Sequence, residues 1–176
     1  IGTRDFFFTA NGVSAPTGQK PQSKLWFNDG FWWGSLFNPE MDSYTIYRFD
    51  EPSNLWVDTG TVVDERNHTY MDVLWDGGYL YIVSAGTNPS LPLYSARVSR
   101  FSYDATTKFY FIDAGFPVTV TNGGTEAIVL SKDTAGWLWI TFTRNNSVYV
   151  SHTTGDDTIW TVPNILPFEE AEDLDD

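Results

Sequence analysis

The sequence predicts an all-β fold built from a repeated unit of about fifty residues. Three polar turns, at residues 49–56, 102–109 and 151–160, each follow an alternating strand and end on a large aromatic residue. The closing residues Trp56, Phe109 and Trp160 lie at intervals of 53 and 51 residues. Aromatic residues make up 17% of the chain, and strands favour aromatic side chains. A period of this length with several short strands is typical of a repeated β unit.

A second landmark repeats in step with the polar turns. It reads glycine, aromatic, Trp or Leu, aromatic, and it occurs at residues 30–33, 78–81 and 136–139. Because successive strand residues point to opposite faces, Trp32 and Trp33 must face different sides of their sheet. The sequence does not decide which of the two is exposed.

The elements can then be assigned in chain order. Residues 1–23 form an entry segment, and residues 169–176 form an acidic tail or a link to a further unit. The three units span about 24–60, 70–118 and 125–167, with turn signals such as Asp29-Gly30 between strands. No segment has helical periodicity, so almost no helix is expected. The expected strands are 24–28, 31–37, 44–49 and 55–58, then 71–75, 79–84, 96–102 and 109–113, then 126–130, 137–142, 147–151 and 159–162.

Four antiparallel strands per unit are typical of a β-propeller blade. A single blade cannot bury both of its faces, whereas blades packed face to face bury their aromatic residues between them. Three blades over residues 24–168 do not close a ring, so two broad apolar faces remain. We therefore expect an incomplete ring, or half of a six-bladed propeller, completed by further blades of the same protein or by a second copy.

Composition narrows the classes of partner. The net charge of −13 and the pI near 4.3 argue against nucleic acid, whose phosphates require a basic surface, and against anionic membranes. There is no cysteine, so disulfides, cysteine-ligated zinc and a thiol nucleophile are excluded. No apolar run is long enough to insert into a membrane, and the chain begins at Ile1. We interpret it as a processed chain or a piece of a longer protein, with an extracytoplasmic or secreted bacterial location as the expectation.

The polar turns resemble the Asp-box of bacterial sialidase-like (BNR-repeat) propellers, Ser/Thr-x-Asp-x-Gly-x-Thr-Trp/Phe. The second unit matches at Ser102, Asp104 and Phe109, with Thr106 and Lys108 in place of the Gly and the Thr. The resemblance covers residues 24–168 and implies a propeller fold in which the box is structural and lies away from the active site. The third unit matches at Thr153 and Trp160 with Asp157 in the Gly position, and the first unit keeps Trp56.

The resemblance also implies a sialidase chemistry that this chain does not supply. That chemistry would require three arginines gripping a carboxylate, a Tyr–Glu nucleophilic pair and an Asp acid/base, and arginine is suited to the grip because it pairs bidentately. Arg48 and Arg100 occupy equivalent points of third strands, toward the outer part of a unit, which favours a structural role. No full catalytic set can be assigned.

One segment carries the densest cluster of candidate ligand-binding side chains. It leads into the first strand of the second unit, which would line the channel of a propeller. A sugar or a metal could bind there; the alternative is a solvated loop between units whose charges pair weakly at the surface. The candidates are Asp64, Glu65, Arg66, His68, Tyr70 and Asp72, joined by Glu126 at the matching strand entry of the third unit.

The sequence predicts no cofactor, and calcium is the one metal ion for which it offers candidate ligands. His68 and His152 have no ligand-like spacing, so no histidine metal site is predicted. Asp156 and Asp157 could offer oxygens to calcium, although turn formation explains them more simply. The leading hypothesis is a non-catalytic recognition or adhesion module that binds glycan or protein. The alternatives are a fragment of a sialidase-type glycoside hydrolase and a structural assembly subunit joined through its open faces.

Overall fold

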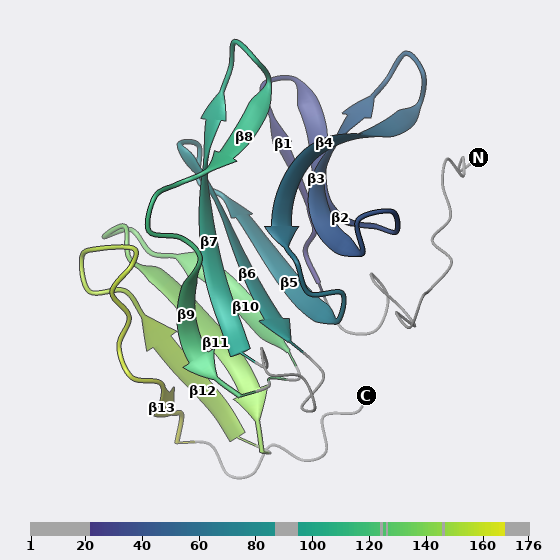
Figure 1. Cartoon of the computed structure of the whole chain (residues 1–176). Helices are drawn as coiled ribbons and strands as arrows, with labels where there is room; N and C mark the ends of the chain where they lie inside the picture. Colours follow the sequence, from purple (N-terminus) through teal and green to yellow (C-terminus); the bar gives the residue numbers. More distant parts are fainter. Residues whose placement is uncertain (1–21, 87–94, 124, 126, 146, 168–176) are drawn as a thin grey trace.

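A computed structural model describes residues 22–86, 95–123, 125, 127–145 and 147–167, and it confirms the all-β class. These residues form antiparallel sheets and contain no helix, so none of them forms a helical membrane span. Sheet A has the strand order β1-β2-β3-β4, sheet B the order β5-β6-β7-β8, and sheet C the order β10-β11-β12-β13. The three sheets follow one another through the molecule (Figure 1).

Sheet A begins with the hairpin that the Asp-Gly pair predicts. Asp29 and Gly30 have φ values of 52° and 79° and connect Asn28 to Phe31, its partner across the ladder. A two-residue loop with both residues at positive φ matches the twist of a hairpin. Its strands are β1 (Leu25–Asn28), β2 (Phe31–Asn38), β3 (Ser43–Asp50) and β4 (Leu55–Asp64).

Sheet B contains one strand that the sequence analysis did not assign. β9 (Val118–Asn122) pairs with the first half of β7, while β8 pairs with the second half. The alternating Val and Thr residues of β9 are β-branched and favour strand, which is a signal that could have identified it. The other strands are β5 (Thr69–Trp75), β6 (Tyr79–Gly86), β7 (Ser95–Asp104) and β8 (Phe109–Ile112).

Sheet C differs from the prediction in its last strand. Residues 159–162 do not form a continuous strand; Trp160 makes an isolated bridge with Thr153, and pairing resumes only after Pro163. Proline has no N–H to donate to a ladder, which explains the interruption. The strands of this sheet are β10 (Ile128–Lys132), β11 (Leu138–Arg144), β12 (Ser147–His152) and β13 (Asn164–Ile165).

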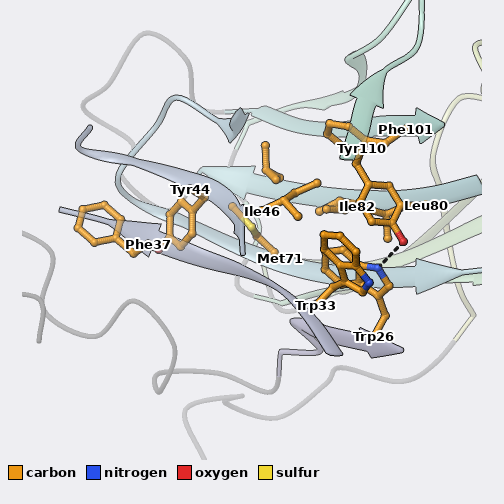
Figure 2. Close-up of a cluster of buried hydrophobic side chains, with 11 residues drawn as sticks. Trp26, Trp33, Phe37, Tyr44, Ile46, Met71, Leu80, Ile82, Phe101 and Tyr110 are labelled. Atoms are coloured by element: carbon orange, nitrogen blue, oxygen red, sulfur yellow. Dashed lines mark hydrogen bonds between the residues drawn. The ribbon is translucent and has the colours of Figure 1, made fainter. Parts of the chain in front are cut away.

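Two hydrophobic clusters join the sheets. The cluster between sheets A and B is aromatic: Trp26 donates to the Tyr110 hydroxyl at 2.9 Å, and the rings of Trp33 and Tyr110 meet edge to face (Figure 2). The cluster between sheets B and C is mostly aliphatic, with Val83 and Val98 of sheet B facing Ile140 of sheet C. Sheet B is therefore covered on both faces.

The repeated glycine-aromatic motif has the same orientation in all three sheets. Leu80 and Leu138, at its third position, point toward the preceding sheet, and Trp33 and Tyr81, at its fourth position, point toward the following sheet. Register places Trp32 and Trp139 on the corresponding outer sides of sheets A and C. Trp33 thus lies in the A–B cluster with Leu80, and Tyr81 lies in the B–C cluster with Leu138. Sheets A and C each keep one face without a neighbouring sheet among the described residues.

Candidate functional site

Asp64 and Arg66, the centre of the predicted ligand cluster, form a buried bidentate ion pair. Asp64 is 1% exposed and Arg66 8% exposed. Arg66 Nε donates to Asp64 Oδ1 at 2.8 Å and Arg66 Nη2 to Asp64 Oδ2 at 2.6 Å. Arg66 Nη1 donates to the Ser95 carbonyl at 2.7 Å, and the Ser84 hydroxyl donates to Asp64 at 2.5 Å. The pair therefore ties the end of β4 to β6 and β7. Both charged groups are engaged by partners within the fold and not by a ligand.

Glu65 and His68 flank this pair. Glu65 is exposed and accepts from Arg97 Nη1 at 2.7 Å. Partial burial opposes ionisation of Glu65, but the hydrogen bonds from Arg97 and from the Glu65 backbone, together with the positive charges of Arg97 and Arg66, outweigh it, so the pKa of Glu65 lies below its usual value. His68 is half-buried in the link between β4 and β5.

Asp72 and Tyr70 lie on the opposite side of sheet B from the Asp64–Arg66 pair. They alternate along β5 and therefore share the face that points toward sheet C. Asp72 Oδ2 accepts the Leu130 N–H of β10 at 2.8 Å, and its carboxylate also accepts the N–H of Ser23 just before β1. Burial raises the pKa of Asp72 despite these backbone hydrogen bonds. Asp72 thus holds the first strands of all three sheets together.

The predicted ligand residues consequently do not converge on one site. Asp64 and Arg66 serve the A–B joint, whereas Asp72 serves the joint between first strands. Glu126 lies outside the described residues. Among the described residues, no group of three acidic or histidine side chains could hold a metal ion.

Two of the three turns that suggested an Asp-box, those of sheets A and B, share one local structure. Asp104 Oδ1 accepts the N–H groups of Thr106 and Thr107 at 2.7 and 3.4 Å, and these bonds lower the pKa of Asp104. Asp50 likewise accepts the N–H of Ser53 in sheet A. The last loop residues, Asn54 and Lys108, both have φ of 58°. An aspartate that bonds the backbone of its own loop stabilises such turns.

The remaining residues of these turns make contacts within their own sheets. Ser102 Oγ donates to Asp113 at 2.6 Å, the Leu138 N–H donates to Thr153 Oγ1 at 3.0 Å, and Phe109 is exposed. Strand register places Trp56 opposite Phe49 and Trp160 opposite Thr153. At the matching place of sheet B, opposite Phe101, the register puts Ile112 rather than Phe109.

Asp157 belongs to a network that sequence reasoning missed. It accepts from Arg100 Nη1 and from the Tyr81 hydroxyl, both at 2.8 Å, and Arg100 Nε also donates to Asp113 at 2.6 Å. The Arg100 guanidinium thus lies beside Asp157, at the place where the sequence would allow a calcium ion. Asp156 accepts from Thr158 within its own turn. Lys132 and Asp76 add a second tie between sheets B and C, at 2.5 Å.

Sequence reasoning also missed the most distinctive exposed surface, which is the outer face of sheet A. A small apolar pocket of about 240 Å³ opens on it. We define the outer face of sheet A as the exposed and half-buried aromatic and leucine residues around this pocket, Leu25, Phe27, Trp32, Phe49 and Trp56. Thr45 and Tyr47 share this side of the sheet but are buried. The signal that could have found it is the third position of the repeated motif, where Trp32 stands in place of leucine.

A second depression lies between β9 and residues 158–163. This open groove of about 430 Å³ is lined by Val, Thr, Ile, Trp and Pro side chains and contains no charged residue. It therefore offers no catalytic acid or base.

Comparison with protein-family models, with curated proteins and with solved structures gave no match to this chain.

Proposed function

We propose that this chain is a sector of a β-propeller that serves as a non-catalytic recognition module. Its recognition surface is the outer face of sheet A, and the partner is an antiparallel sheet built on the same plan. The support comes from three antiparallel sheets of four, five and four strands in chain order, each facing the next with the same side. An extracytoplasmic location remains part of the proposal.

The observation that carries the proposal is the exposure of Trp32. Leu80 and Leu138 hold the same position in sheets B and C and are 0% exposed, whereas Trp32 is 48% exposed. Leu25 and Phe27 beside it are about half exposed as well. Fully burying a large apolar side chain contributes roughly 1.5–3 kcal/mol, so a sheet placed on this face would gain substantial stabilisation.

The arginine contacts favour recognition over sialidase-type hydrolysis. Arg66, Arg97 and Arg100 are paired with carboxylates, and Arg144 donates to Thr121 and to the Asn122 carbonyl. Arg48 lies 5.0 Å from the centre of the Phe31 ring. Gripping a substrate carboxylate would require several of these guanidinium groups to leave their present partners.

Paired substitutions at one repeat position test the proposal. Trp32→Ser should leave the melting temperature within a few degrees of the parent and should remove most binding of a fluorescent apolar dye. Leu80→Ser, at the matching buried position, should unfold the chain because it places a hydroxyl in the A–B cluster. Circular dichroism and dye fluorescence report both results. If Trp32→Ser unfolds the chain as Leu80→Ser does, the outer face belongs to the fold and the proposal fails.

A further inference from the structure

We propose that a second copy of this chain supplies the sheet that covers the outer face of sheet A, docking head to tail through its own sheet C. This inference rests on the proposed function. The second copy would present the outer face of sheet C, defined as Val129, Ser131, Trp139, Thr141, Thr143 and Val150.

The argument is continuity with the two joints inside the chain. In each joint, the fourth motif position of one sheet lies in the same buried cluster as the third position of the next: Trp33 with Leu80, and Tyr81 with Leu138. Two members of this series remain unmatched, namely Trp139 on sheet C and Trp32 on sheet A. Placing sheet C of one copy on sheet A of another brings them together in the same orientation.

The apolar pocket on sheet A lies where such a joint would receive an aromatic side chain. Its lining residues are Leu25, Trp32, Phe49 and Trp56. Strand register makes Leu80 and Phe101 the counterparts of Trp32 and Phe49 in sheet B, and both lie in the cluster that buries Trp33. A volume of about 240 Å³ is smaller than the pockets that bind drug-sized ligands and suits a single side chain. Trp139 of the second copy is the expected occupant.

Charge makes this joint weaker than the two internal ones. Inside the chain, Asp29 pairs with Lys108 and Asp76 with Lys132, each across a joint. Asp133 is the matching hairpin acid of sheet C, but Asn54 stands in sheet A where sheet B has Lys108. Each copy also carries a net charge of −13, so copies repel at low salt. Association should therefore depend on concentration and increase with salt.

The contact is heterologous, because two different faces meet. Such a contact forms a closed ring when the rotation between copies allows it, and an open chain of copies when it does not. Light scattering in about 0.5 M NaCl, where the Debye length is only several ångströms, should report particles larger than one chain.

A cross-linking experiment tests the orientation directly, because the chain has no cysteine. In the A–B joint, Ser35 donates to the Met71 sulfur at 3.2 Å. The counterparts in a copy–copy joint are Thr141 of one chain and Ser23 of the other, and both are exposed. Ser23→Cys and Thr141→Cys are made separately, and each variant is treated with a short bismaleimide alone and as an equal mixture.

Head-to-tail docking predicts a cross-linked dimer in the mixture and little in either variant alone. Adding Trp32→Ser to the Ser23→Cys chain should abolish the cross-link, whereas Val162→Ser, at an 82% exposed valine in the groove beside β9, should not. Dimers in one variant alone would indicate like faces meeting and would overturn the inference, as would a monomer without cross-links at high salt. In either case, folded Trp32→Ser with reduced dye binding would leave the proposed function standing.

Discussion

The outer faces of sheets A and C end the same stack of sheets, yet they differ in polarity. The outer face of sheet A has Trp32 exposed at the position where sheets B and C bury Leu80 and Leu138. On sheet C, Ser131, Thr141 and Thr143 stand where sheet B has Leu74, Val83 and Ala85. Trp139 remains on sheet C, half-buried between its own hairpin and the His152 ring.

This difference indicates that the two outer faces differ in how much stability they gain from being covered. A terminal repeat with a polar outer face is stable in water, whereas an exposed apolar face favours association with a partner surface. The outer face of sheet A is therefore the end where a partner gains most. The outer face of sheet C would contribute mainly through Trp139.

The largest expected effect concerns the fourth position of the repeated motif, which is Trp33 in the A–B cluster and Trp139 on the outer face of sheet C. Trp33→Ala should lower the free energy of unfolding by about 3–5 kcal/mol, because it opens a cavity among aromatic residues. Trp139→Ala should lower it by about 1 kcal/mol, since its outer side has no sheet to lose. Urea denaturation measures both. Equal losses would show that the outer face of sheet C is covered within the chain.

The next comparison concerns one position of the first strands, occupied by Asp72 in sheet B and Val129 in sheet C. Asp72→Ala should cost about 2–3 kcal/mol, because it leaves the N–H groups of Leu130 and Ser23 without their acceptor. Val129→Ala should cost less than about 0.5 kcal/mol, since Val129 is exposed. Chemical denaturation of both variants provides the check. If Asp72→Ala leaves the free energy of unfolding unchanged, Asp72 does not hold the first strands together.

Lys24 holds this same position in sheet A, and it predicts a pH dependence. Burial lowers the pKa of Lys24 to about 7, so between pH 7 and its usual pKa the unfolded chain binds a proton that the folded chain does not. Stability should therefore rise with pH above about 7, by about 1.4 kcal/mol per pH unit at most, and should stay level with respect to this group below it. Thermal unfolding from pH 7 to 9 tests this. Lys24→Met is the control and should flatten the rise; a rise that persists in this variant would assign it elsewhere.

The smallest expected effect concerns the third strands, where Arg100 of sheet B corresponds to His152 of sheet C. Arg100 joins Asp113 to Asp157 across the B–C joint, so Arg100→Gln should cost about 1 kcal/mol and lose that cost at high salt. His152→Gln removes ring contacts with Trp137 and Trp139 and should cost about 0.5 kcal/mol, independent of salt. Denaturation at two salt concentrations distinguishes them. A salt-independent loss for Arg100→Gln would assign its role to packing.

Much of the fold could be read from local patterns. Asp29-Gly30 predicted a hairpin because these residues tolerate positive φ, and alternation located most strands because one face of each is buried. The end of sheet C was predicted less well. Pro163 interrupts a segment whose apolar residues otherwise suggest a continuous strand.

The candidate site was less predictable than the strands. The segment from Asp64 to Asp72 contains the charges and hydroxyls of a binding loop, and nothing local distinguishes that use from a structural one. Asp64 meets Ser84, and Asp72 meets Leu130, only after distant strands are brought together. The partners of a charged side chain depend on pairing between strands, which local periodicity does not specify.

The sequence by itself determined the all-β class, the repeated motif and the alternation that sends Trp32 and Trp33 to opposite faces. Only the tertiary structure decided that Trp33 is buried and Trp32 exposed. The physical reason is that alternation fixes the relative direction of neighbouring side chains, whereas exposure depends on which face another sheet covers.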